Sequence, residues 1–314
     1  MAILQGKLFF PECERRLESY DVVYFHDGEK IDKRRADIEV ILIYGTPGGE
    51  QLTKLMDELP NLKAIVNHGV GVNHIDLEAA KARGIKVSNT PDCLNAAVAE
   101  MAFALLLAAA RHVVTGNARS HDPTYTRLQP NWHGTEVSGS AIGIVGMGRI
   151  GMEIAQRARA FNMKIFYHNR KRRSVEEEAT VKATYCEELN ALLGQVDFVV
   201  VMVPGGEATR KLFKWEQFCA MKETAYFVNV SRGTVVDQDA LVRALNEKRI
   251  AGAALDVTDP EPLPPDHPLL RMENVLITPH LGSATTRTRR KMFDVCMENV
   301  DAALQNKELP NRLV

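Results

Sequence analysis

Residues 141–168 read AIGIVGMGRIGMEIAQRARAFNMKIFYH, and this stretch decides the fold. A short apolar run leads into three glycines, apolar residues then recur at helical spacing as far as Phe161, and a second short apolar run follows. The order predicts a strand, a helix and another strand, which together form a βαβ unit.

The glycines of this unit have the spacing of a dinucleotide-binding turn: Gly146, Gly148 and Gly151. The first glycine permits a sharp turn, the second lets the backbone approach a pyrophosphate, and the third lets the helix pack closely on the strand. The N-terminus of the helix offers free N–H groups to the phosphates. Glycine-rich turns also arise for packing alone, but the flanking strand and helix favour a dinucleotide site.

The end of the second strand indicates which dinucleotide binds. NAD sites usually carry a carboxylate about 20 residues after the glycines, where it bonds the ribose 2′-hydroxyl. This chain instead continues His168-Asn169-Arg170-Lys171, and no acid appears before Glu176. Neutral and basic side chains attract a 2′-phosphate, so the sequence predicts NADPH as the preferred cofactor, with NADH possible. The alternative is a solvated basic turn without a ligand.

Length and composition describe a globular protein of two domains. The chain has 314 residues, 45% of them hydrophobic and 25% charged, and a formal net charge of −1, so neither nucleic acid nor an anionic membrane is expected as a partner. Residues 1–10 lack the pattern of a secretion signal, and the apolar run 96–110 is too short to span a bilayer. The five scattered cysteines are typical of reduced thiols, and a cytoplasmic location is expected.

The first hundred residues alternate short apolar runs with helical patterns and predict a small parallel-sheet domain. Helices are expected at 50–59 and 77–83, and Gly84 ends the second. Strands are expected at 8–10, 22–25, 40–44, 64–67 and 86–88. The loop after residue 67 contains Val70 and Gly71, whose backbone N–H groups are candidates for holding a substrate carboxylate, although a plain tight turn is the alternative.

A long apolar segment joins this domain to the next. Its apolar residues predict one buried helix over 95–114. Residues 116–139 are polar and rich in turn formers, so they are expected to be irregular. Long segments of this kind are usually functional, and we interpret this one as a subunit interface.

The second domain places three candidate catalytic residues at one edge of its sheet. Near-continuous apolar strands are expected at 196–203, 225–231, 252–257 and 275–278, with helices at 214–221 and 238–248. Arg232, Glu261 and His280 follow three of these strands. Since the carboxyl ends of parallel strands share one edge, the three side chains are predicted to converge beside the nucleotide. Singly, each could be an ordinary surface or capping residue.

The chemistry that suits these three side chains is hydride transfer between a nicotinamide and a 2-oxo acid. A histidine can protonate the carbonyl oxygen, and a carboxylate behind it favours the charged imidazole. An arginine can hold the substrate carboxylate through two hydrogen bonds and polarise the carbonyl. The cofactor would supply the hydride.

Several motifs in order resemble the D-isomer-specific 2-hydroxyacid dehydrogenase family over nearly the whole chain. They are Val70-Gly71, GMGRIG at 146–151, NVSRG at 229–233, ALDV at 254–257, PEP at 260–262 and PHLGSAT at 279–285. Within the family, residues 256–263 and 283–289 are most similar to glyoxylate/hydroxypyruvate reductases. Two departures are His168, where NAD-dependent members have an acid, and the sequence VPGG at 203–206.

The resemblance implies a role for each matching residue. Arg232 would hold the substrate, Glu261 would pair with the histidine, His280 would act as acid and base, and Val70 and Gly71 would bind the substrate carboxylate. Asp256 would bond the nicotinamide carboxamide. The other residues implied to contact the cofactor are Arg149, Ile150, Val203, Pro204, Thr209, Val230, Ser231, Arg232, His280 and Gly282, beside the three glycines and residues 168–171.

The resemblance also implies the architecture. It is an α/β fold of two doubly wound parallel-sheet domains, a Rossmann dinucleotide-binding domain over 95–286 and a smaller flavodoxin-like substrate domain over 1–94 plus 287–314. Members of the family are usually homodimers, which agrees with the interface interpretation of residues 116–139.

Three functional hypotheses remain open at this point. The first is an NADPH-preferring reductase of glyoxylate, hydroxypyruvate or a related small 2-oxo acid. The second is a reductase of a bulkier 2-oxo acid, such as 2-ketogluconate or phenylpyruvate. The third is a dinucleotide-sensing protein without enzymatic activity, like the co-repressors that share this fold, because a fold does not fix a function. The intact set of Arg232, Glu261 and His280 favours catalysis.

Overall fold

The computed structural model describes residues 2–5, 11–44, 47–125 and 132–314. The chain forms two compact units: unit 1 contains Met1–Leu94 and Thr285–Val314, and unit 2 contains Asn95–Ala284. The strand expected at 8–10 lies outside the described residues. The first strand that the structure describes is at Ala2–Gln5. Residues 126–131 of the segment expected to be irregular also lie outside them.

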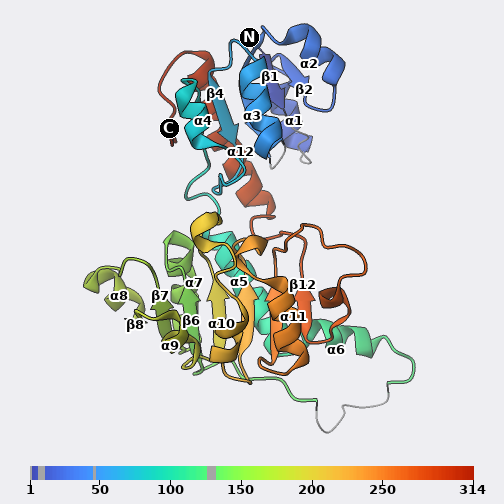
Figure 1. Ribbon diagram of the computed structural model, residues 1–314, viewed down its shortest axis with the longest axis vertical. Helices are drawn as coiled ribbons and strands as arrows, with labels where there is room; N and C mark the ends of the chain where they lie inside the picture. Colours follow the sequence, from blue (N-terminus) through green and yellow to red (C-terminus); the bar gives the residue numbers. More distant parts are fainter. Residues whose placement is uncertain (1, 6–10, 45–46, 126–131) are drawn as a thin grey trace. The chain divides into compact units, whose positions relative to one another are not determined.

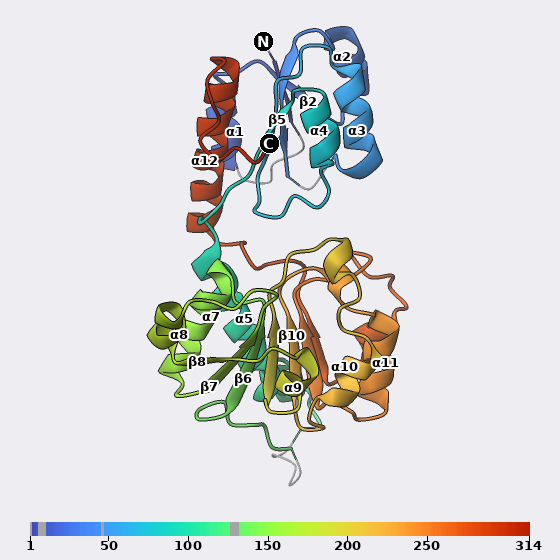
Figure 2. The same ribbon diagram turned by 60° about the vertical axis from the view of Figure 1, so that its left-hand side comes forward.

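Unit 1 is a parallel five-stranded sheet with helices on both faces (Figures 1 and 2). Its strand order is β2-β1-β3-β4-β5, the doubly wound order of flavodoxin-like folds. Its elements are β1 (Ala2–Gln5), α1 (Pro11–Leu17), β2 (Val22–Tyr24), α2 (Gly28–Arg34), β3 (Ile38–Ile43), α3 (Gly49–Glu58), β4 (Ala64–Asn67), α4 (Leu77–Ala82), β5 (Lys86–Ser88) and α12 (Thr286–Leu304).

Local signals in the sequence set the ends of these elements. The Asp76 carboxylate accepts a hydrogen bond of 2.8 Å from the Ala79 N–H and caps α4, and Gly84 follows the helix with a φ of +69°. The C-terminal helix α12 packs its apolar side, with Phe293 and Val300, against the sheet residues of β3 and β4. The last segment of the chain thus completes the core of the first domain.

Unit 2 is a parallel seven-stranded sheet with the order β12-β11-β10-β9-β6-β7-β8. Renumbered from β6, this is the Rossmann order extended by one strand. Its elements are α5 (Asn95–Ala110), α6 (Val113–Ser120), β6 (Ala141–Val145), α7 (Arg149–Ala160), β7 (Lys164–His168), α8 (Val175–Val181), β8 (Ala183–Tyr185), α9 (Leu189–Leu193), β9 (Phe198–Val201), η1 (Glu207–Thr209), α10 (Trp215–Ala220), β10 (Tyr226–Asn229), η2 (Gly233–Val235), α11 (Gln238–Asn246), β11 (Gly252–Leu255), η3 (Pro268–Arg271) and β12 (Val275–Ile277). The two parallel sheets confirm the predicted fold class.

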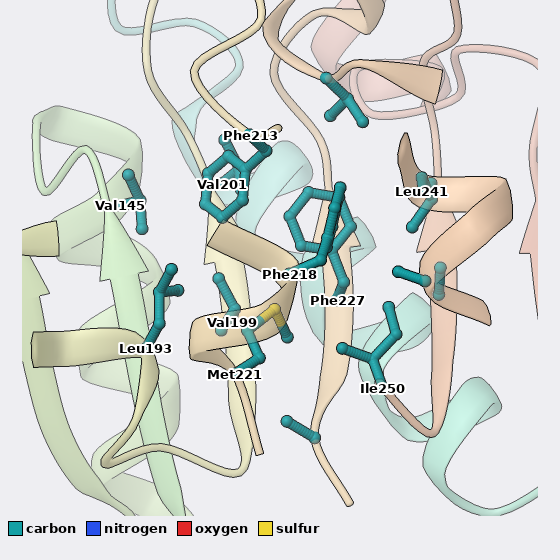
Figure 3. Close-up of a cluster of buried hydrophobic side chains, with 14 of the residues drawn as sticks. Val145, Leu193, Val199, Val201, Phe213, Phe218, Met221, Phe227, Leu241 and Ile250 are labelled. Atoms are coloured by element: carbon teal, nitrogen blue, oxygen red, sulfur yellow. The ribbon is translucent and has the colours of Figure 1, made fainter. Parts of the chain in front are cut away.

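The core of unit 2 explains why its central strands are apolar throughout. All residues of β6, β9, β10 and β11 are buried, as a sheet covered by helices on both faces requires. Figure 3 shows Phe213, Phe218 and Phe227 meeting beside β9 and β10. Their ring centroids lie 4.9–6.1 Å apart, within the range of favourable aromatic contacts. This packing holds α10 on the sheet whose edge carries the candidate site.

The prediction of a single helix over 95–114 is wrong. The chain breaks at His112, which has a left-handed φ of +53°, and α6 leaves α5 at an angle of 56°. The Thr135 N–H donates to the carbonyl of Ala110 at 2.8 Å, so the end of α5 is satisfied by a distant segment. The start of the segment expected to be irregular is therefore helical, whereas the described residues 132–139 carry no helix or strand.

Among the described residues, no single helix has the length and apolar character needed to cross a membrane. Only the bent pair α5 and α6 meets that criterion, jointly and by length and composition alone. Half of the residues of α5 are buried inside the protein, as in a core helix.

Candidate active site

The glycine turn between β6 and α7 has the geometry predicted for it. Gly146 has a φ of +99°, and a Cβ there would lie 2.6 Å from the carbonyl oxygen of Met202. A Cβ on Gly151 would lie 2.5 Å from the carbonyl oxygen of Gly146. Only glycine fits at these two positions, because both turn and helix pack directly against backbone.

The middle glycine, Gly148, faces open space instead. A Cβ on Gly148 would meet nothing within 4 Å, and this residue is the N-cap of α7 without a capping side chain. Gly148 thus provides no capping side chain for the first N–H groups of α7. The open space beside it lets a ligand approach the backbone. Arg149 and Ile150 begin the helix at this point. The turn fits a dinucleotide pyrophosphate.

The turn after β7 uses its polar residues in two ways. Asn169 Oδ1 accepts a hydrogen bond of 2.7 Å from the Met147 N–H, and the ring Nδ1 of His168 lies 3.1 Å from the carbonyl oxygen of Cys186. These two side chains are therefore engaged with the backbone. Arg170 and Lys171 are exposed.

His280 and Glu261 form a hydrogen-bonded pair at the carboxyl edge of the sheet. The ring Nδ1 of His280 lies 2.7 Å from Oε1 of Glu261, and both side chains are partly exposed. Burial raises the pKa of Glu261, but the hydrogen bond and charge of His280, a backbone hydrogen bond from Thr258 and the charge of Arg232 together outweigh it, so this pKa lies below its ordinary value. Because an ionised carboxylate cannot donate, Nδ1 carries the hydrogen and Nε2 is left for a substrate.

Arg232 lies close enough to this pair to interact with its carboxylate. Burial lowers the pKa of the Arg232 guanidinium, and the charge of Glu261 opposes that effect. Its backbone is held by Asn229, whose amide donates to the Arg232 carbonyl at 2.9 Å and accepts from the N–H and hydroxyl of Ser231. A Cβ on Gly233 would overlap the Thr258 carbonyl, so this turn packs directly on the segment that leads to Glu261.

The backbone of His280 is held by Asp256. His280 has a left-handed φ of +54°, and its N–H donates to the Asp256 carbonyl at 2.9 Å. The Asp256 carboxylate is buried and accepts three further hydrogen bonds of 2.6–2.7 Å, from the Thr278 hydroxyl and from the N–H groups of Leu281 and Gly282. This one side chain organises the loop that presents the histidine.

The loop with Val70 and Gly71 belongs to unit 1. The amide of Asn67 donates to the carbonyls of Gly69 and Gly71 at 3.0 and 3.1 Å, and Asn89 donates to the Val70 carbonyl at 2.9 Å. Because Asn67 and Asn89 bond these carbonyls, the peptide groups of this loop are held in one orientation.

Comparison with known proteins agrees with this geometry. Residues 103–282 match the family model described as "D-isomer specific 2-hydroxyacid dehydrogenase, NAD binding domain". The chain belongs to the D-isomer specific 2-hydroxyacid dehydrogenases. The matched segment includes the glycine turn, Arg232, Glu261 and His280. The family resemblance seen in the sequence is confirmed.

Several similar proteins are named as reductases of glyoxylate or hydroxypyruvate. The chain is 43% identical to a glyoxylate reductase of Pyrococcus horikoshii over 83% of this chain and 78% of that one. It is 44% identical to a glyoxylate/hydroxypyruvate reductase B of Escherichia fergusonii over 80% and 78%. The crystal structure of an NADPH-dependent glyoxylate/hydroxypyruvate reductase from Sinorhizobium meliloti, with NADP and malonate, superposes with a TM-score of 0.87 at 33% identity, covering 100% of this chain and 96% of that one.

The remaining predicted cofactor residues of this dehydrogenase lie at the ends of β9 and β10 or on the histidine loop. Val203 and the exposed Pro204 follow β9, and the Thr209 hydroxyl donates to the Pro204 carbonyl at 2.7 Å. Val230 and Ser231 are buried after β10. A Cβ on Gly282 would lie 3.1 Å from Asp256 Oδ2, so a side chain there would require that carboxylate to shift slightly.

Three residues position loops in a way that the family motifs do not indicate. Asn229, Asn67 and Glu178 each do so through side-chain hydrogen bonds. Asparagine two residues before a serine is typical of a local side-chain turn, so Asn229 could have been found. Asp256 was assigned to the nicotinamide, and its contacts with the histidine loop were not foreseen.

Proposed function

We propose that this dehydrogenase reduces a small 2-oxo acid, glyoxylate or hydroxypyruvate, to the D-2-hydroxy acid, with NADPH as the preferred cofactor. The observation that carries the proposal is the hydrogen-bonded pair of His280 and Glu261, with Arg232 beside it, at the carboxyl edge of a sheet that begins with a dinucleotide turn. The names of the relatives from Pyrococcus horikoshii and Escherichia fergusonii support the substrate class.

Each residue has a distinct task in this reaction. A nicotinamide dinucleotide supplies a hydride when it is bound. Arg232 pairs with the substrate carboxylate and polarises the carbonyl. His280 donates the proton on Nε2 to the carbonyl oxygen, and Glu261 holds the ring by its Nδ1.

The preference for NADPH is supported by charge. Arg170 and Lys171 are exposed after β7, and the chain has no acid at residues 168–173 that would repel a 2′-phosphate. The Sinorhizobium meliloti relative is described as NADPH-dependent and binds NADP.

The test is the loss of absorbance of NADPH and, separately, of NADH with purified protein. The panel contains glyoxylate, hydroxypyruvate, phenylpyruvate and 2-ketogluconate. We expect rapid turnover of the two small acids with NADPH. Turnover only of the two large acids would overturn the substrate class, and equal rates with both cofactors at limiting concentration would overturn the cofactor preference.

The role of His280 is tested by His280→Gln. We expect kcat to fall by roughly 10²–10⁴-fold, since a general acid contributes about that much, while NADPH binding measured by calorimetry stays unchanged. Loss of NADPH affinity with normal kcat would assign His280 to the cofactor instead.

We further propose a homodimer in the cytoplasm. Val113 and Val114 on α6 are 56% and 51% exposed, and an apolar surface of this kind is typical of an interface. No disulfide joins the five cysteines within the described part of the chain, which supports a reducing compartment.

A further inference from the structure

The turn that follows β7 rests on an ion pair between the exposed Arg172 and a buried acid, and the reaction itself does not use this pair. Glu178 of α8 is 7% exposed. The Nε and Nη2 groups of Arg172 donate to its two carboxylate oxygens at 2.8 Å each, and the hydroxyl of the buried Tyr167 donates to it at 2.5 Å. Hydrogen bonds from Arg172 and Tyr167 lower the pKa of Glu178 to about 2, so the carboxylate stays charged.

The same contacts hold the backbone of residues 167–173 from both sides. The Tyr167 hydroxyl accepts a hydrogen bond of 2.9 Å from the Arg173 N–H. The Arg172 guanidinium lies 5.6 Å from the centre of the Tyr185 ring, and the Tyr185 hydroxyl donates to the carbonyl of Asn169 at 3.2 Å. The Asn169 carbonyl is thus tied to β8, the edge strand beside β7, and the Arg173 N–H is tied through Tyr167 to Glu178 of α8 (Figure 1).

Four consecutive basic residues are therefore not equivalent. Arg172 is paired with Glu178, and Arg173 lies 3.2 Å from Glu177. Arg170 and Lys171 make no ion pair within the described residues and are exposed between the two fixed ends of the turn. A guanidinium on a fixed backbone loses less freedom when it binds a phosphate than one on a loose turn.

We propose that Glu178, through Arg172, Tyr167 and Tyr185, is a positioning residue that fixes Arg170 and Lys171 for the 2′-phosphate of NADPH. The proposal rests on the proposed use of NADPH. It assigns Arg172 to the support of the turn and only Arg170 and Lys171 to the phosphate.

A simple charge argument predicts the opposite result, which makes the proposal testable. Removing any acid near an anion strengthens anion binding, and releasing Arg172 would offer the phosphate one more guanidinium. If Glu178 positions the turn, its removal instead weakens phosphate binding. The direction of the change decides between the two.

The experiment is calorimetric titration with adenosine 2′,5′-bisphosphate and with 5′-AMP, which lacks the 2′-phosphate and serves as the reference. We expect Glu178→Gln to raise the Kd of the bisphosphate by about ten- to a hundredfold, the effect of roughly one charge-assisted hydrogen bond, and to leave that of 5′-AMP unchanged. The matched control is Glu176→Gln, which removes an exposed acid from the same helix. It should leave both constants unchanged or tighten the bisphosphate slightly.

A second variant covers the case in which Glu178→Gln fails to fold. Tyr185→Phe removes only the hydroxyl that bonds Asn169, and it should weaken the bisphosphate several-fold without affecting 5′-AMP. In steady state, both variants should raise KM for NADPH while kcat and KM for NADH stay at wild-type values. Tighter or unchanged bisphosphate binding in both variants would overturn the proposal.

The result also separates this inference from the proposed function. If the wild-type protein binds the bisphosphate no better than 5′-AMP, the NADPH preference itself is wrong. If the wild type discriminates and Arg170→Ala abolishes that discrimination while Glu178→Gln and Tyr185→Phe do not, only the positioning role is wrong.

Discussion

At the scale of single residues, His280 combines a strained backbone conformation with hydrogen bonds that offset the strain. His280 has a left-handed φ of +54°, which costs a residue with a side chain about 1–2 kcal/mol. Four hydrogen bonds from its loop to the backbone and carboxylate of Asp256 hold that conformation. In this conformation the ring Nδ1 lies 2.7 Å from Glu261 Oε1, whereas the sequence alone places the two residues only on the same edge.

The pairing of His280 with Glu261 predicts a change in pH dependence. Glu261 has a lowered pKa, so it is charged at neutral pH and favours the protonated imidazole. In Glu261→Gln this charge is absent, and we expect the decline of kcat/KM for reduction at rising pH to begin at a lower pH than in the wild type. At acid pH, where Glu261 of the wild type is itself protonated, the kcat/KM values of the two enzymes should converge.

The measurement is kcat/KM for glyoxylate across the pH range with saturating NADPH. Glu176→Gln removes an equal charge far along the chain on α8 and serves as the control. Superimposable profiles for Glu261→Gln and the wild type would contradict the pairing.

At the scale of elements, each helix buries one face against a sheet whose two faces are both apolar. The helix α10 has only six residues, too few to be stable alone, and it is held by Phe218, which is fully buried against Phe213 and Phe227. Figure 3 shows these rings between β9, β10 and α11. The two strands that this core supports end beside Pro204 and Arg232.

Truncation of this core should therefore be costly. We expect Phe218→Ala to lower the free energy of unfolding by about 3–5 kcal/mol, because a large ring is removed from a packed interior. Val175→Ala on α8, where the valine is 69% exposed, should change it by less than about 0.5 kcal/mol. Denaturant unfolding followed by circular dichroism measures both, and equal midpoints would contradict the packing argument.

At the scale of the whole molecule, the chain passes between its units twice, after Leu94 and before Thr285. Unit 1 therefore needs both ends of the chain, since α12 packs on β3 and β4. Unit 2 carries α6, whose exposed valines are the basis for the proposed dimer.

The dimer is tested by Val113→Asp. A buried carboxylate without a partner is strongly unfavourable, so we expect the variant to elute as a monomer in size-exclusion chromatography with light scattering, where the wild type elutes as a dimer. Val175→Asp alters a valine that is more exposed and should keep the dimer. Dimeric Val113→Asp would place the interface elsewhere, and a monomeric wild type would refute the dimer.

The sequence by itself determined the βαβ unit, the parallel sheets and the edge on which Arg232, Glu261 and His280 lie. These follow from local patterns, because apolar runs form buried strands and the ends of parallel strands meet at one edge. The same reasoning placed the glycines of the turn, since their role depends on close backbone contact that no other residue permits.

Only the tertiary structure decided what each polar side chain does. Asn169 bonds Met147, which is 22 residues away, and Asp256 bonds Gly282 across 26 residues. The break at His112 likewise depends on a hydrogen bond from Thr135 to the end of α5. A polar side chain can bond any suitable partner that folding brings near it. Its role therefore depends on distances between segments, and a local sequence pattern carries no information about those distances.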